Sequence, residues 1–515
     1  MPSGILKPSS GCSITPDTDM SRVRKELYFG TLLYGACVAG AVGPLLIPGF
    51  SLVAAQFQIS LTQVTILNGV LIMALGISAY LCAPLANCYG QRVIYLLTSI
   101  LITIGCIWAS YARTYGSLLG SRTLQGFGLG GFMSLAGTAS INSVFARHER
   151  GRRVGLWNFA ILLSVNLTPV ISGYVITALG WPWSFRILAI ASGLALLLAF
   201  LFVPDALVEQ DMLHGVPGLT EQDQPLGDKD IESRSTMPVE ISPPGSPETL
   251  DAEIGTAGPG RTDFLGLRRM RSGSFQRLPS MIVSSFSALR HPVVIWASAM
   301  WSVFFTWVII QGAVADQIYT ASPYNLPAAT VGILIGVPPL IGSALGTVLG
   351  GWSSDRTVDI LVRSNNGIYE PEFRLPLIGP GTLFCALGAY GLGLAVNTGS
   401  TVWASAVLLG VLNFGVGLGC TGIVAYINDS LGQAAADCMG ITMIIKSCFA
   451  FGIAFILNDY YAQRGPVVFF VTWASLTIGV ALTTVPLYIF GKRIRESHMS
   501  QNIILRNGLQ IGVVS

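Results

Sequence analysis

Long apolar runs, each about the length of a membrane-crossing helix, fill most of the chain on both sides of one polar segment. A helix needs about 20 mostly apolar residues to cross a bilayer. Six such runs precede the polar segment, at 27–50, 63–84, 93–112, 116–140, 154–178 and 185–204. Six more follow it, at 292–318, 327–350, 376–396, 401–426, 437–458 and 466–490. The pattern predicts an all-α membrane protein with 12 transmembrane helices in two six-helix bundles.

The polar segment, residues 205–290, separates the two predicted bundles. It holds half of the chain's 26 acidic residues, many prolines and, near its end, a group of arginines. Such a composition buries too little apolar surface to offset the entropy cost of ordering, so we expect a disordered linker. The predicted organisation is a cytoplasmic tail (1–26), an N-terminal bundle (27–204), a cytoplasmic linker (205–290), a C-terminal bundle (291–490) and a cytoplasmic tail (491–515).

Basic residues gather in alternate connections between the predicted helices. Lys and Arg concentrate on the cytoplasmic side of membrane proteins. One set of connections and both tails carry many bases, whereas the other set offers only Arg113, Arg186 and Arg464. Both termini are therefore predicted to be cytoplasmic.

Composition narrows the function classes. Apolar residues make up 52% of the chain, charged residues only 11%, and the mean hydropathy is +0.63, which is typical of a polytopic membrane protein. The nine cysteines form no C-x-x-C pair, and the four histidines lie in joints or tails. We therefore expect no metal site, no cofactor and no enzymatic activity. Neither a basic, aromatic-rich patch for nucleic acid nor a phosphate-binding loop for ATP is found.

A charge inside a predicted membrane helix is costly unless it faces water or a partner, and three such residues are the main candidates. Arg122 lies in the fourth helix, and no acid occurs between Glu26 and Glu149. We expect Arg122 to face a central cavity or backbone carbonyls. Asp316 lies near the outer end of the seventh helix, and Lys446 lies within the eleventh. These three are candidates for proton coupling or for the wall of a substrate cavity.

Uncharged polar side chains in apolar surroundings are candidate donors and acceptors for a substrate. For each of them the alternative is an ordinary hydrogen bond between helices. The candidates are Gln125, which we group with Arg122, and also Asn68, Asn158, Asn166, Gln311 and Asn413.

Two connections at equivalent places in the halves are variants of one pattern, G-x-x-x-D-R-x-G-R-R. The first, APLANCYGQR (83–92), keeps Gly90 and Arg92, but its Asp is replaced by Asn87. The second, GWSSDR (351–356), keeps the residues Gly351, Asp355 and Arg356. Both loops resemble the gating loop of the major facilitator superfamily, which implies an internal repeat in which these loops brace the cytoplasmic helix ends.

Two helix motifs extend this resemblance. SRTLQGFG (121–128) is similar to the family's R-x-x-Q-G motif, which implies that Arg122 takes part in coupling. The fifth helix carries Gly155, Pro169 and Gly173, which match part of the pattern that is associated with antiporters. ERGRRVGLWN (149–158), SNNGIYEPEFRLP (364–376) and IIKSCFAFG (444–452) resemble a fungal, drug/proton antiporter-like branch, which includes polyamine and organic cation carriers and exporters of secondary metabolites.

These observations lead to the hypothesis of a secondary active transporter that moves a small organic molecule by alternating access, coupled to protons. Export of a secondary metabolite or toxin is favoured, and Arg122 with Lys446 would suit an anionic or neutral substrate. One alternative is proton-coupled uptake of a nutrient or of an organic cation such as a polyamine. Another is a transporter-like nutrient sensor. We expect a monomer in the bilayer of the plasma membrane, with a vacuolar or other internal membrane as the alternative.

Overall fold

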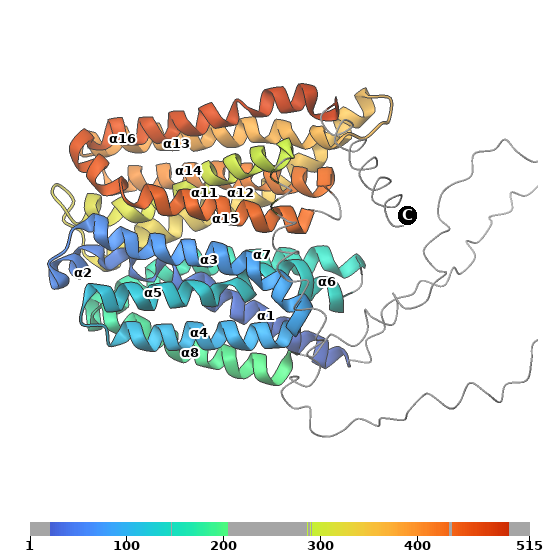
Figure 1. Ribbon diagram of the computed structural model, residues 1–515. Coiled ribbons are helices and arrows are strands. Elements are labelled where there is room, and N and C mark those ends of the chain that lie inside the picture. The colour runs from blue at the N-terminus through green and yellow to red at the C-terminus, as the bar shows by residue number, and fades with distance from the viewer. Residues whose placement is uncertain are drawn as a thin grey trace, which may run out of the picture.

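The computed structural model describes residues 21–145, 147–203, 286, 289, 291–431 and 435–493. Within these ranges the regular structure is helical, and the helices form two bundles that lie side by side (Figure 1). The bundle drawn in blue to green comes from the N-terminal half, and the one in yellow to red from the C-terminal half.

The N-terminal bundle contains the six predicted crossings. Its elements are α1 (Arg22–Val42), η1 (Pro44–Gly49), α2 (Phe50–Phe57), α3 (Leu61–Tyr89), α4 (Gln91–Ser110), α5 (Tyr115–Gly130), η2 (Gly131–Ser140), α6 (Ile141–Val144), α7 (Arg147–Leu179) and α8 (Trp181–Phe202). The first crossing runs through α1, η1 and α2, and the fourth through α5 and the π-helical η2.

The C-terminal bundle repeats this plan. Its elements are α11 (Pro292–Tyr319), α12 (Ala328–Ser364), η5 (Pro371–Leu377), α13 (Ile378–Asn397), α14 (Val402–Leu431), α15 (Ala435–Ala454) and α16 (Leu457–Ala481). The segment assigned to α16 contains a kink at Gly465, whose φ of 76° is the left-handed conformation that glycine tolerates. The kink separates the end of the eleventh crossing from the twelfth.

The predicted fold is confirmed. In the described part of the chain, 10 helical segments are long and apolar enough to cross a membrane, and a shorter apolar helix runs from Cys438 to Ala454. Together with α5 and η2 they match the 12 predicted runs. Most of the predicted linker and most of both tails lie outside the described residues, and the cytoplasmic position of the termini stays a prediction.

The first crossing changes its helix type in the middle of the bundle. Gly43 and Pro44 interrupt α1, and the chain continues as the 3₁₀ segment η1, with Pro48 inside it. Proline has no N–H to donate, so a regular α-helix cannot continue unchanged through these positions. The break therefore frees backbone carbonyl groups near Val42 for side-chain donors.

The two bundles meet mainly through the pairs α3 with α15 and α7 with α12. In the second pair the backbones are very close, because a Cβ on Gly332 would lie 2.2 Å from the carbonyl oxygen of Pro169. A Cβ on Gly173 would likewise lie 2.7 Å from the carbonyl oxygen of Ala328. These contacts lie toward the end of the molecule that carries α2, which we call the base-poor end (left in Figure 1). The opposite, base-rich end carries Arg92, Arg153, Arg356 and Arg374.

Candidate functional site

A cavity of about 120 Å³ lies between the two halves. Helices α1, α3, α5 and α7 of the first half line it, together with η1, η2 and α2, and α11 closes it from the second half. Its lining residues are Ala39, Gly40, Gly43, Pro44, Ile47, Phe50, Thr65, Asn68, Leu71, Ile72, Leu75, Leu129, Met133, Val165, Phe305, Val308, Ile309 and Ala313. Within this lining set, Thr65 and Asn68 supply the polar side chains. We call it the central cavity.

Arg122 lies behind the N-terminal wall of the central cavity and is 0% exposed. Its Nη1 donates to the carbonyl oxygen of Val42 at 2.8 Å and to Oε1 of Gln125 at 3.0 Å. Its Nη2 donates to Oδ1 of Asn68 at 3.5 Å, and the guanidinium lies 5.1 Å from the ring centre of Phe185. All these acceptors are neutral, and the buried Nε has no acceptor among the described residues. Arg122 therefore bonds to a backbone carbonyl and reaches the cavity through Asn68.

Gln125 holds Arg122 in place one helical turn further on. Its Oε1 accepts from Arg122, and its Nε2 donates to the carbonyl oxygen of Gly105 in α4 at 2.9 Å. Gly105 is required there, because a Cβ would lie 2.7 Å from Cγ of Gln125. The R-x-x-Q-G spacing places both side chains on one face of α5, since residues three apart are neighbours on a helix.

Lys446 lies behind the opposite wall, in α15, and is 7% exposed. Its Nζ is 4.0 Å from the ring centre of Phe305 and 4.9 Å from that of Trp301, both in α11. Phe305 also lines the central cavity. The two aromatics lie four residues apart on one helix, but only the fold reveals that they cage a lysine from another helix. Such cation–π contacts stabilise an ammonium group without neutralising its charge.

Asp316 joins the two halves at the base-poor end of the central cavity. It is 0% exposed, and its Oδ2 accepts from the backbone N–H of Ser51 at 2.6 Å. Ser51 lies in the first turn of α2, where helix N–H groups are unpaired and the helix dipole favours a negative charge. The other oxygen, Oδ1, has no partner within the described part of the chain. Ser51 could not be identified from sequence, because its contribution is a backbone group.

Further hydrogen bonds close the base-poor end between α3 and the first turn of α16. The hydroxyl of Thr62 donates to Oδ1 of Asp459 at 2.8 Å. The side-chain amide of Asn458 donates to Oγ1 of Thr65, a cavity-lining residue, at 2.6 Å. Sequence reasoning missed these residues, because almost 400 positions separate the members of each pair and no local pattern connects them.

The remaining amide candidates lie in different surroundings. Gln311 and Asn413 form a reciprocal pair, with Nε2 to Oδ1 at 3.1 Å and Nδ2 to Oε1 at 2.8 Å. Asn166 donates to the carbonyl oxygen of Leu162 in its own helix at 2.8 Å. Asn158 is exposed on α7. Of the five amide candidates other than Gln125, Asn68 is the one that lines the central cavity.

The loop that resembles the gating motif of the first half has lost its charged centre. Gly90 ends α3 with a φ of 94°, and Arg92 donates to the carbonyl oxygen of Phe200 in α8 at 2.9 Å. Gln91 accepts from the hydroxyl of Ser140 at 2.8 Å. The bond between Ser140 and Gln91, which carries no charge, thus lies beside the loop of the first half.

The equivalent loop of the second half keeps its charges. Arg374, in η5, pairs with Asp355 at 2.7 Å and with Asp429 at 2.8 Å. Tyr369 also donates to the carboxylate of Asp429, and burial together with this hydrogen bond raises the pKa of Tyr369. Arg356 is exposed, and Gly351 has open space around it. Arg374, in the EPE-RL string, joins these two acids, and the loop resemblance alone did not single it out.

The motif of the fifth helix lies partly at the contact between the halves. Pro169 and Gly173 face α12, where Gly332 and Ala328 approach their backbone. Gly155, nearer the base-rich end, has open space where a methyl group would lie, with no atom within 4 Å among the described residues. Two of the three motif residues therefore set how closely α7 and α12 pack.

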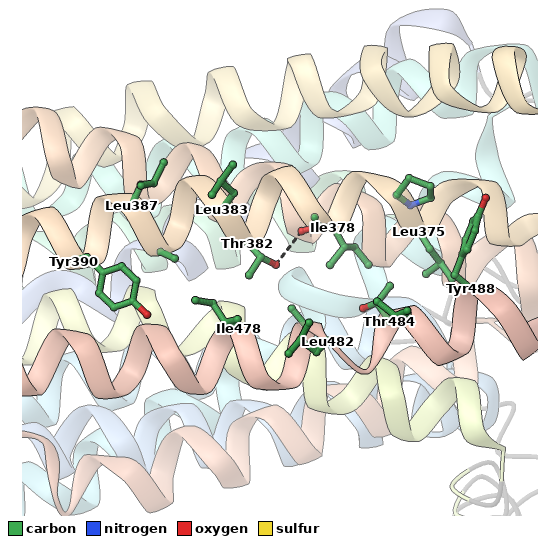
Figure 2. Close-up of a pocket in the computed structure, with 15 residues that line it drawn as sticks. Leu375, Ile378, Thr382, Leu383, Leu387, Tyr390, Ile478, Leu482, Thr484 and Tyr488 are labelled. Carbon is green, nitrogen blue, oxygen red and sulfur yellow. Dashed lines mark hydrogen bonds between the residues drawn. The ribbon is translucent and has the colours of Figure 1, made fainter.

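A larger cavity of about 660 Å³ lies away from the central cavity, between α13 on one side and α16 with the residues that follow it on the other (Figure 2). Its walls are mainly leucine, isoleucine and alanine, and the hydroxyl of Thr382 donates to the carbonyl oxygen of Ile378 in its own helix. Tyr390 and Tyr488 mark its two ends in Figure 2. With no charged residue in its lining, this groove offers no chemistry for coupling.

Comparison with known proteins agrees with the fold. The sequence model of the Major Facilitator Superfamily matches residues 27–456. MFS transporter cpaT of Aspergillus oryzae is 26% identical over 488 residues, covering 93% of this chain and 90% of that protein. The probable efflux pump mfs2 of Aspergillus flavus is 24% identical over 466 residues, covering 88% and 100%. The crystal structure of a D-xylose-proton symporter aligns with a TM-score of 0.59 at 15% identity, covering 90% of this chain and 96% of that one. The resemblance drawn from the motifs is thus confirmed: the chain belongs to the Major Facilitator Superfamily, a family of multi-pass membrane transporters and not of enzymes.

Proposed function

We propose that this protein is a proton-coupled secondary transporter that exports a small organic molecule by alternating access. The observation that carries the proposal is the central cavity, which lies between the halves and is bordered by buried ionisable groups from both. Transporters of this architecture bind substrate near the middle of the bilayer, where the two repeats meet. Because Phe305 and Asn68 come from different halves, a substrate in this cavity would touch both.

In this proposal, the base-poor end is the gate that must open to release substrate. It is held by the contacts of Asp316 with Ser51 and of Thr62 with Asp459, and by the close packing of Gly332 on Pro169. None of these contacts is covalent. Small residues leave smooth surfaces on α7 and α12, so the two helices can separate without moving large side chains.

Proton coupling is assigned to Arg122, Asp316 and Lys446. The carboxylate of Asp316 is a proton acceptor that also caps α2 across the gate, so gaining a proton changes the charge on a contact between the halves. Arg122 shares its donors between Val42 and the cavity residue Asn68. A substrate that hydrogen-bonds to Asn68 would displace Arg122 from it. Because Arg122 also bonds to Val42, substrate binding would then affect the break in α1.

Export is the direction favoured by the motif of the fifth helix and by the relative named as an efflux pump. With the base-rich end in the cytoplasm, substrate would enter there and leave at the base-poor end, while protons move inward. The lining of the cavity supports export of an apolar organic compound over uptake of a polyamine, because no carboxylate lies among the lining residues.

The test uses purified protein in liposomes that carry a pH gradient. The vesicles are incubated with an organic extract of fungal culture medium, and the compounds inside are measured by mass spectrometry. At least one compound is expected to accumulate with the gradient, and an ionophore or the Arg122→Ala variant should abolish this. If no compound distributes differently between vesicles with and without the protein, the proposal is wrong.

A further inference from the structure

Two buried cations flank the central cavity, one behind each wall. Arg122 touches the wall residue Asn68, and Lys446 touches the wall residue Phe305. The two bases lie in α5 and α15, which belong to opposite halves. The cavity and these two bases form a binding site that has a positive charge on each side and apolar side chains between them.

The charges at this site do not cancel. Arg122 binds only neutral acceptors, and Lys446 has neither a carboxylate nor a hydrogen-bond acceptor within the described part of the chain. Asp316 is the acid next to the cavity, and its carboxylate is directed to the N–H of Ser51 at the base-poor end. Counting Arg122, Lys446 and Asp316 as charged leaves an excess of one positive charge. A buried charge without a partner is costly, so the site favours a ligand that brings a negative charge.

The remainder of the lining selects the body of the ligand. Apart from Thr65 and Asn68, the lining residues are aliphatic, aromatic or glycine. The volume of about 120 Å³ is close to that of an apolar protein cavity of about 150 Å³ that binds benzene. The described state thus accommodates roughly one ring of an apolar molecule.

We infer that the central cavity binds an amphipathic organic monoanion, with its apolar body against Phe305 and its anionic group paired with the ammonium of Lys446. This inference rests on the proposed role of the cavity as the transport site. Lys446 is a substrate-binding residue in this account, and Arg122 positions the opposite wall through Asn68. The flexible stem of the lysine lets its ammonium move from the aromatic rings to an anion, whereas an organic cation would meet two positive charges.

The experiment measures equilibrium binding of three ligands, each a phenyl ring with one polar group, to the full chain in detergent. The ligands are radiolabelled benzenesulfonate, benzenesulfonamide and benzylammonium, which are anionic, neutral and cationic. A direct pair of opposite charges in a medium of intermediate polarity changes affinity by about 10-fold or more. We therefore expect benzenesulfonate to bind at least about 10-fold more tightly than benzenesulfonamide, and benzylammonium to bind most weakly.

Three variants identify the cation responsible. Lys446→Gln should weaken benzenesulfonate by about 10-fold and leave benzenesulfonamide within about 2-fold. Lys446→Arg, which keeps the charge, should retain the preference for the anion. Arg464→Gln removes an exposed positive charge at the base-poor end and should change neither affinity.

The outcomes separate this inference from the proposed function, because binding in detergent requires no transport. Equal or tighter binding of benzylammonium, or no saturable binding of any of the three ligands, would overturn the inference. An equal loss of affinity for benzenesulfonate and benzenesulfonamide in Lys446→Gln would also overturn the inference, because the substitution would then affect only packing. If Lys446→Gln does not fold, the ranking of the three ligands by the wild type decides. A preference for the anion without gradient-driven flux in liposomes would overturn the transport proposal and leave the binding inference standing.

Discussion

The close packing of Gly332 against α7 leads to a quantitative prediction about the gate. A Cβ at this position would lie 2.2 Å from the carbonyl oxygen of Pro169, and Cβ atoms essentially never approach other atoms closer than 3.0 Å. In Gly332→Ala the two helices must therefore separate by roughly 1 Å or distort. Both partners are backbone, so no side chain can rotate away.

The cost falls on the state in which the base-poor end is closed. Overpacking by one methyl group costs about 1–3 kcal/mol. Because the contact joins the two halves, the state with this end open does not bear that cost. Each 1.4 kcal/mol changes an equilibrium about tenfold, so the open population should rise by a factor of about 5 to about 140.

Distances between spin labels measure this population. Labels on Leu179→Cys in α7 and Ala321→Cys before α12 report the width of the base-poor end, in a background without the native cysteines. Pulsed electron paramagnetic resonance should show a larger long-distance population in Gly332→Ala. Gly193→Ala in α8 is the matched control, because its methyl group meets nothing within 4 Å. An unchanged distance distribution in folded Gly332→Ala would refute the reasoning.

Further predictions concern the buried polar groups. Gln311→Leu leaves the buried Oδ1 of Asn413 without its donor and should destabilise the protein by about 1–3 kcal/mol in thermal unfolding, whereas Gln311→Leu combined with Asn413→Leu should recover part of the loss. Arg122→Lys keeps the charge, but a lysine cannot bond to the carbonyl of Val42 and to Oδ1 of Asn68 at the same time. Gradient-driven flux should therefore fall although the protein folds. Full flux in this variant would contradict the coupling role. Arg374→Gln should lower the melting temperature at low salt more than at high salt, since its pairs with acids are partly exposed, and an equal loss at both would count against an ionic brace.

The fold followed from the sequence because bilayer length and hydrophobicity constrain each crossing separately. The same pattern placed Arg122, Asp316 and Lys446 inside the membrane. The exceptions were irregular segments, such as the 3₁₀ turn after Gly43 and the π-helical stretch after Gly130, whose form depends on packing. Hydrophobicity alone carries no information on these.

The partners of the buried charges were not accessible in the same way. Val42 and Ser51 contribute backbone atoms, which leave no trace in residue type. Phe305 is one of many apolar residues in its helix until the fold brings Lys446 over its ring. Gln311 and Asn413, in contrast, look like ligand-binding amides in sequence, and the structure pairs them with each other.

Alternating access is the central claim, and paired distance measurements at both ends test it most directly. One label pair spans the base-poor end (Leu179 and Ala321), and a second spans the base-rich end (Leu156 in α7 and Ile360 in α12). Across acidic and mildly alkaline buffers, the account predicts opposite changes: whenever the base-poor pair moves apart, the base-rich pair moves together. If both ends stay fixed, or widen and narrow together, the two halves do not alternate around the cavity and the account is contradicted.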